Sequence, residues 1–253
     1  MQPTKSSENY LSQLKQYTVA RVGLNRTGIS KTTEDLLKLK AAHANAKDSL
    51  YQIFEKNQIA NSILALSREV VELKSNAIDK KEFLLRPDLG RHLNNESKIL
   101  INENSAGNQY DVCITISDGL SAGALNKHAF PLLDLLLPKI DTAGLSIAPI
   151  CIVENGRVAI SDETGFLSNA KISLILIGER PGLTAPDSMG AYLTYDPKPA
   201  NTDADRNCVS NIHFGGLSYV EATEEIFSIM KKSMQLKLSG STLLLQDNKN
   251  LNQ

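Results

Sequence analysis

The chain has 253 residues, of which 42% are hydrophobic and 22% charged, and its net charge at pH 7 is −1. This length can bury a sizeable core in one large domain or two modest ones, and the near-neutral charge gives no field that would concentrate nucleic acid or an anionic membrane. The polar first residues lack the order of a secretory signal, and no apolar run reaches the roughly 18 residues of a membrane span. We therefore expect a soluble, intracellular protein that binds neither nucleic acid nor membrane.

The first 105 residues are predicted to form a small helical domain, because apolar side chains recur three or four positions apart along them. One helix is expected to begin near 30–33, and a second to cover 61–73. Pro87 suits the first turn of a third helix, since it lacks the N–H that this turn leaves unpaired. The first helix has one apolar face, made of Leu36, Leu39, His43, Ala46, Leu50 and Ile53.

Residues 106–253 alternate between strand and helix patterns, which predicts a Rossmann-like, mostly parallel sheet flanked by helices. The fold class is therefore α/β. Ser218 and Glu221 have the spacing of a capping box at the start of the last helix, which is expected to stop near Gly240. In chain order the predicted elements are a strand at 112–116, a helix at 121–137, a strand at 147–153, a turn at Asn155-Gly156 leading into 157–160, a helical stretch at 162–167, a strand at 172–177, a further strand at 192–195 and a helix at 219–238.

The loops after the strands are the expected ligand site, because ligands of open α/β sheets bind outside the carboxyl ends of the strands. Three loops are candidates, at 117–121, 178–182 and 203–211, and each combines glycine or small polar residues with a charge. Asp118 and Ser121 in the first loop also suit helix capping, which is the commoner role for such residues.

Two residues of the other loops have competing interpretations. Glu179 directly follows a buried strand, so it either faces a ligand or forms an ion pair with Arg180 or Arg206. Cys208 lies in a polar loop context, where a structural thiol is a commoner role than a nucleophile or a ligand.

The motifs of several enzyme classes are absent. The sequence contains no Gly-x-x-x-x-Gly-Lys, Gly-x-Gly-x-x-Gly, Gly-x-Ser-x-Gly or His-Glu-x-x-His, which disfavours kinases, dehydrogenases, serine hydrolases and metalloproteases. The cysteines lack the close Cys or His partners of a zinc site, so Cys113 and Cys151 are expected to be buried, reduced thiols. The histidines are scattered along the chain. The residues alone therefore predict no catalytic set and no metal site.

The sequence resembles the small subunits of ethanolamine ammonia-lyase in five strings that occur in the same order as in that family. The resemblance covers residues 10 to 240, and it is specific because all five strings are in register. They are Thr18–Gly28, Arg86–Arg91, Ile116–Ser121, Gly178–Leu183 and Asp205–Ile212.

The resemblance implies a non-catalytic subunit of an ammonia-lyase that is active only with a large subunit, in a higher-order hetero-oligomer. The implied reaction converts ethanolamine to acetaldehyde and ammonia with adenosylcobalamin as cofactor, in the cytoplasm within a bacterial microcompartment. The domain at 106–253 would contact the cobalamin, and the family's cofactor contacts fall on Val158, Glu179 and Cys208. The Asp-x-His-x-x-Gly motif of some other cobalamin proteins is missing, so a bound corrinoid is expected to keep its own base on cobalt.

Two other functions remain open at this point. The α/β crevice is also compatible with a non-catalytic binding or scaffold protein for a nucleotide-like ligand. A self-sufficient small lyase or hydrolase has the least support, since it would need turnover by this chain alone.

Overall fold

The computed structural model describes residues 13, 17, 26, 27 and 29–250, so that all of the string Thr18–Gly28 except residues 26 and 27 lies outside the described part. The helices are α2 (Thr33–Tyr51), α3 (Lys56–Ala65), α4 (Lys80–Leu85), α5 (Asn95–Ser105), α6 (Ala122–Thr142), α7 (Ile160–Leu167), α8 (Tyr219–Leu236) and α9 (Gly240–Asn250), with single 3-10 turns η1 (Leu89–Arg91) and η2 (Asp203–Asp205). The strands are β1 (Arg26–Thr27), β2 (Ser30–Lys31), β3 (Val70–Lys74), β4 (Tyr110–Ser117), β5 (Ile150–Glu154), β6 (Ala170–Gly178), β7 (Met189–Tyr195) and β8 (Asn207–Ile212).

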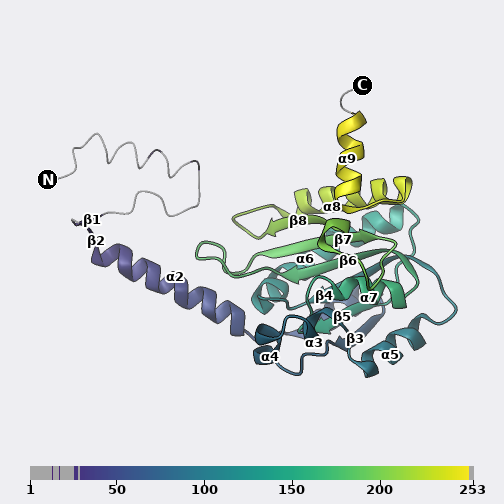
Figure 1. The fold of residues 1–253 in the computed structure, drawn as a ribbon, viewed down its shortest axis with the longest axis horizontal. Coiled ribbons are helices and arrows are strands. Elements are labelled where there is room, and N and C mark those ends of the chain that lie inside the picture. The colour runs from purple at the N-terminus through teal and green to yellow at the C-terminus, as the bar shows by residue number, and fades with distance from the viewer. Residues whose placement is uncertain (1–12, 14–16, 18–25, 28, 251–253) are drawn as a thin grey trace.

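A six-stranded sheet forms the centre of the molecule (Figure 1), with the strand order β3-β5-β4-β6-β7-β8. The first four strands in this order pair in parallel, and β7 and β8 continue the sheet antiparallel. This confirms the predicted α/β class and the mostly parallel sheet. Among the described helices, none combines the length and the apolar character that crossing a bilayer needs.

Helices cover both faces of the sheet because its central strands are apolar on both faces. Val112, Ile114 and Ile116 of β4 belong to the core shared with α3, α6 and α8. Cys113, between them, belongs to the second core on the side of α5 and α7. Adjacent strands β4 and β5 thus continue into α6 and α7 on opposite faces of the sheet, which leaves a crevice at their carboxyl ends.

Helix α2 extends away from the sheet and its flanking helices, and only its last turns meet them (Figure 1). Ser49 joins it to the start of α6, since its Oγ lies 2.7 Å from Ser121 Oγ and donates to the carbonyl oxygen of Pro186 at 2.6 Å. The expected apolar face of this helix is not a packing face over its whole length. Leu36 is 41% exposed, and Ile53 lies beyond the helix end and is 81% exposed.

Two predicted helices in the first 105 residues are wrong in part. The second helix is α3, and residues 70–74 form strand β3, because Val71 and Leu73 bury one side there while the backbone pairs with β5. The segment at Pro87 forms only η1, since a tertiary hydrogen bond of 2.7 Å from Arg157 N to Gly90 O holds it against another loop. The division of the chain at residue 105 stays a prediction.

Four boundaries in the second half also differ from the prediction. The strand expected at 147–153 begins at Ile150, because Pro149 has no N–H to donate. The turn expected at Asn155-Gly156 is followed by irregular backbone at 157–159, and α7 begins at Ile160. The expected loop at 203–211 contains strand β8, which pairs with the edge of β7. The capping box at Ser218 is confirmed, but α8 ends at Leu236 because Lys237 adopts a left-handed φ of 56°.

Candidate functional site

Asp118 joins the turns that follow β4 and β5. Its carboxylate receives hydrogen bonds from Lys80 Nζ at 2.7 Å and from the backbone N–H of Asn155 at 2.7 Å. Lys80 Nζ also donates to the carbonyl oxygen of Gly119 at 2.7 Å. Burial raises the pKa of Asp118, and the ammonium of Lys80 opposes that rise. Asp118 therefore holds the turns after β4 and β5 together through its hydrogen bonds. Ser121 has the predicted capping role on α6.

The backbones of the loops after β4 and β6 are in direct contact at Gly119 and Gly178. Leu120 N donates to Gly178 O at 2.9 Å, and a Cβ placed on Gly178 would lie 2.1 Å from Ser121 O. Gly119 has a φ of +52°, a left-handed conformation that glycine adopts without a steric cost. Both glycines are therefore required for the first two predicted loops to meet, as the topology of the sheet leads one to expect.

Val158 and Glu179 line one pocket of about 350 Å³ at this edge of the sheet. Its apolar wall includes Phe83 and Leu120. Arg157 also lines it, with its guanidinium 4.1 Å from the Phe83 ring centroid. The two predicted residues come from different loops, after β5 and after β6, and the fold brings them together.

Arg157 and Arg180 are the cationic residues that line this pocket, and Arg157 packs on its aromatic wall. Arg157 Nη2 donates to Phe83 O at 3.0 Å, while the buried Nε of Arg157 has no hydrogen-bond partner in the described part of the chain. Burial lowers the pKa of Arg157, and the charge of Asp118 acts against that effect. A buried N–H without a partner is costly, so this donor is a candidate for a ligand contact.

Glu179 is held by its neighbours without an ion pair to either predicted arginine. Its Oε2 accepts from Ser188 Oγ at 2.5 Å and from Asn211 N at 3.4 Å. Arg206 instead pairs with the carboxylates of Asp162 and Asp203. The expected ion pair of Glu179 with Arg180 or Arg206 is therefore not formed, and the ligand-facing interpretation of Glu179 stays a prediction.

Cys208 does not line the pocket itself. It lies opposite Tyr192 in the β7/β8 register, and Tyr192 is a lining residue. Burial raises the pKa of the Cys208 thiol, although the side chain keeps an exposed part. Burial and the contact with Cys208 raise the pKa of Tyr192. Tyr192 thus connects the third predicted residue to the other two.

Sequence reasoning missed Phe83, Arg157 and Tyr192 as lining residues. The only available signal was the position of Arg157 directly before Val158. Phe83 is distant in the chain, and no local pattern marks it as part of the site. Within the residues that the structure describes, no group of three or more His, Cys, Asp or Glu side chains could hold a metal ion.

The family model described as "Ethanolamine ammonia-lyase light chain (EutC)" matches residues 8–244. Similar curated proteins include an "Ethanolamine ammonia-lyase small subunit" of Pseudomonas aeruginosa, 42% identical over 243 residues, which are 95% of this chain and 89% of the relative. One of Azotobacter vinelandii is 42% identical over 240 residues, 94% of this chain and 89% of the relative. One of Pseudomonas syringae is 40% identical over 245 residues, 96% of this chain and 85% of the relative. The matched segment includes every residue of the pocket described above, and the chain belongs to the ethanolamine ammonia-lyase light-chain family.

Proposed function

We propose that this chain binds adenosylcobalamin together with an ethanolamine ammonia-lyase large subunit, and that the complex converts ethanolamine to acetaldehyde and ammonia. The family membership and the words "small subunit" in the relatives' names support a partner of this kind. The observation that carries the proposal is that Val158 and Glu179 line the same pocket. Cys208 lies next to this pocket, because it is paired with the lining residue Tyr192 in the sheet.

The chemistry of the pocket fits one side of a corrinoid. A corrin is a broad ring with apolar faces and a rim of amide side chains. Leu120 and Val158 offer apolar contact, Glu179 offers a hydrogen-bond acceptor, and the unpaired Nε of Arg157 offers a donor. The pocket is open on one side, which leaves room for a second polypeptide to cover the ligand.

When bound, adenosylcobalamin supplies radical chemistry through homolysis of its cobalt–carbon bond. The residues of this chain have supporting roles. Glu179 is positioned by Ser188 to orient polar groups at the ring edge. Val158 and the apolar wall exclude water from that side of the cofactor, which protects a reactive intermediate. None of these roles is acid–base catalysis of the reaction. In this proposal, turnover therefore requires the large subunit.

The proposal extends to assembly and location. We infer a higher-order hetero-oligomer of small and large subunits, acting in the cytoplasm within a bacterial microcompartment. The family membership supports both inferences. The size of the purified complex tests the first, and fractionation of cells tests the second.

Co-expression with a cognate large subunit tests the proposed function. We expect ethanolamine-dependent acetaldehyde formation that requires adenosylcobalamin, and no turnover by this chain alone. A well-folded complex without activity would contradict the proposal. Calorimetry of the isolated chain with adenosine nucleotides distinguishes the proposed function from a nucleotide-binding scaffold. A scaffold would bind the nucleotide tightly without any partner, whereas the proposed function predicts little binding.

A further inference from the structure

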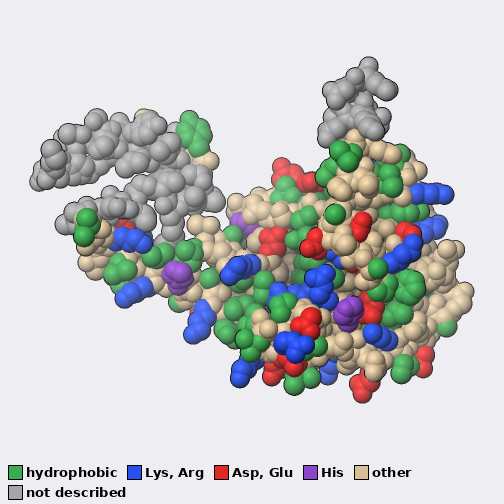
Figure 2. Space-filling view, viewed as in Figure 1, with side chains coloured by type: hydrophobic (Ala, Val, Ile, Leu, Met, Phe, Trp, Pro, Cys, Tyr) green, Lys and Arg blue, Asp and Glu red, His purple; other side chains and the backbone are tan. Residues whose placement is uncertain are grey.

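A second pocket, of about 590 Å³, lies next to the first, between α2 and the loops after β4 and β6. The two pockets share Leu120, Arg157 and Arg180 as lining residues. Blue Lys and Arg side chains are visible in Figure 2 where α2 meets the rest of the molecule. The two pockets therefore adjoin each other, and a ligand larger than the first would reach toward the second.

The second pocket is basic. Its described lining residues include His43 and Lys47 from α2, Arg157 from the turn before α7 and Arg180 from the loop after β6, and they include no Asp or Glu. In the described part of the chain, neither Lys47, Arg157 nor Arg180 takes part in an ion pair.

The carboxylates of Asp118 and Glu179, in the loops that border the pocket, already have hydrogen-bond partners. Asp118 attracts Arg157 electrostatically, but its oxygens are bonded to Lys80 and to the backbone of Asn155. Glu179 accepts its hydrogen bonds from Ser188 and Asn211. Several cations converging on one hollow repel one another, so the arrangement favours an anionic ligand.

The shape of the cations indicates the kind of anion. Guanidinium groups match the paired oxygens of phosphate, and charge-assisted hydrogen bonds of this kind are among the stronger ones in proteins. Arg157 contributes an unpaired Nε. Apolar side chains of Leu50, Leu84 and Pro181 line the same pocket, which suits a phosphate ester with an organic body better than free inorganic phosphate.

We propose that this basic pocket binds a phosphate ester, namely the phosphodiester in the nucleotide loop of the corrinoid. The assignment rests on the proposed function. The phosphodiester is the anionic group of a cobalamin, and a corrinoid that keeps its own base on cobalt holds this group close to the ring. A ring seated against Val158 and Glu179 thus places its phosphodiester within reach of the adjoining pocket.

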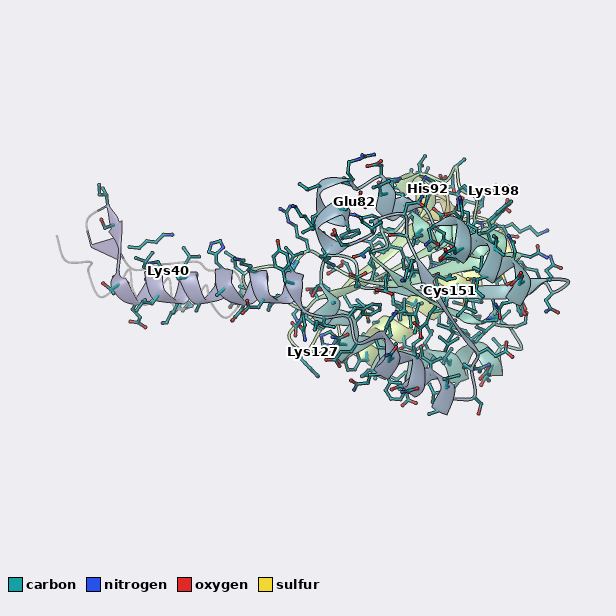
Figure 3. The ribbon with its side chains drawn as sticks, turned by 90° about the horizontal axis from the view of Figure 1, so that it is seen from below. Lys40, Glu82, His92, Lys127, Cys151 and Lys198 are labelled. Carbon is teal, nitrogen blue, oxygen red and sulfur yellow. The ribbon has the colours of Figure 1, made fainter. Side chains whose placement is uncertain are left out.

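Cobinamide, which lacks the nucleotide loop and its phosphate, makes the test selective. The complex of this chain with the large subunit is dialysed against cyanocobalamin or cobinamide, and binding is followed by corrin absorbance. We expect Lys47→Gln, which changes a residue that lines the second pocket and not the first, to weaken cyanocobalamin binding about tenfold while cobinamide binding is unchanged. Lys40→Gln is the matched control, because Lys40 lies on the part of α2 that extends from the body (Figure 3) and does not line the pocket.

Cobinamide lacks the base as well as the phosphate, but this difference from cyanocobalamin affects wild type and variant equally. A loss of affinity that the variant shows for cyanocobalamin alone therefore reports the phosphate contact. An equal loss of affinity for both corrinoids, or no loss for either, would overturn the inference. A wild-type complex that binds neither corrinoid would instead overturn the proposed function on which it rests. Binding of adenosine monophosphate by the isolated chain, abolished by Arg180→Gln, would assign the pocket to a free nucleotide and not to the corrinoid.

Discussion

Arg206 and Asp162 form an ion pair in which the two side chains are 2% and 1% exposed. The pair joins the segment that enters β8 to the first turn of α7. Val158 lies just before α7 and Cys208 lies in β8, so this buried contact fixes two of the predicted cofactor residues relative to each other. Arg206 also donates from Nη1 to the exposed carboxylate of Asp203 at 2.6 Å.

Removing Arg206 is expected to destabilise the protein strongly. Arg206→Ala should lower the free energy of unfolding by about 3–5 kcal/mol, because it leaves the charge of Asp162 buried without a partner. Asp203 is 90% exposed, so Asp203→Ala should cost less than about 1 kcal/mol. Urea unfolding of both variants measures the two values. Similar losses would mean that the buried half of the network has no special role.

Gly178 offers a steric test of the contact between the loops. Gly178→Ala should cost about 1–3 kcal/mol, because its Cβ would overlap the carbonyl oxygens of Ser121 and Asp118. Gly182→Ala in the same loop places its Cβ no closer than 3.4 Å to any neighbour and should stay within about 0.5 kcal/mol of wild type. Thermal unfolding compares the pair, and an equal effect of both would contradict the close approach.

Glu179→Gln is expected to separate cofactor binding from stability. The amide keeps an oxygen that can accept from Ser188, so the melting temperature should be unchanged. The affinity of the complex for cobalamin should fall about tenfold, because a charged acceptor is lost. Equilibrium dialysis measures this affinity. Glu103→Gln on the exposed side of α5 is the control, and unchanged binding in Glu179→Gln would remove Glu179 from the site.

Thiol labelling should distinguish Cys208 from the other cysteines. Cys113 and Cys151 are buried and Cys208 is exposed, so the native chain should react at one thiol and the unfolded chain at three. Burial raises the pKa of Cys208, so its labelling at neutral pH should be slower than that of a free thiol. Addition of the large subunit and cobalamin should slow it further. Undiminished labelling in that complex would argue against the proposed position of Cys208.

His128 should make the fold sensitive to mild acid. The side chain is buried, its Nδ1 lies 2.8 Å from Tyr219 Oη, and its Nε2 has no hydrogen-bond partner among the described residues. Burial lowers its pKa, outweighing the attraction of Asp187. The unfolded chain therefore binds the proton more readily, so this contribution to stability is complete above about pH 6.5 and is lost as the pH falls below it.

Urea unfolding at pH 7.5 and pH 5.5 measures this effect. The loss of stability between the two values should be smaller in His128→Phe than in wild type, whereas exposed His43→Gln should behave as wild type. An identical pH dependence in wild type and His128→Phe would show that other groups account for the acid sensitivity.

The sequence by itself determined the elements with strong local patterns. The β-branched runs of β4 and β6 predicted buried strands, and Ser218 with Glu221 predicted the start of α8. The strings shared with known small subunits identified the family, because they span most of the chain. The order of strands and helices also placed the loops after β4 and β6 at one edge of the sheet.

Only the tertiary structure decided the features that depend on distant partners. Strand β3 lies in a segment with a helical pattern, and it became a strand because β5 offered an edge to pair with. Arg157 became a lining residue of the pocket because its guanidinium packs on the ring of Phe83, which is distant in the chain. Lys80 and Asp118 are joined although many residues separate them in the chain. Hydrogen bonds, ion pairs and buried contacts between such residues leave no local pattern, since their energies arise only when the chain has folded.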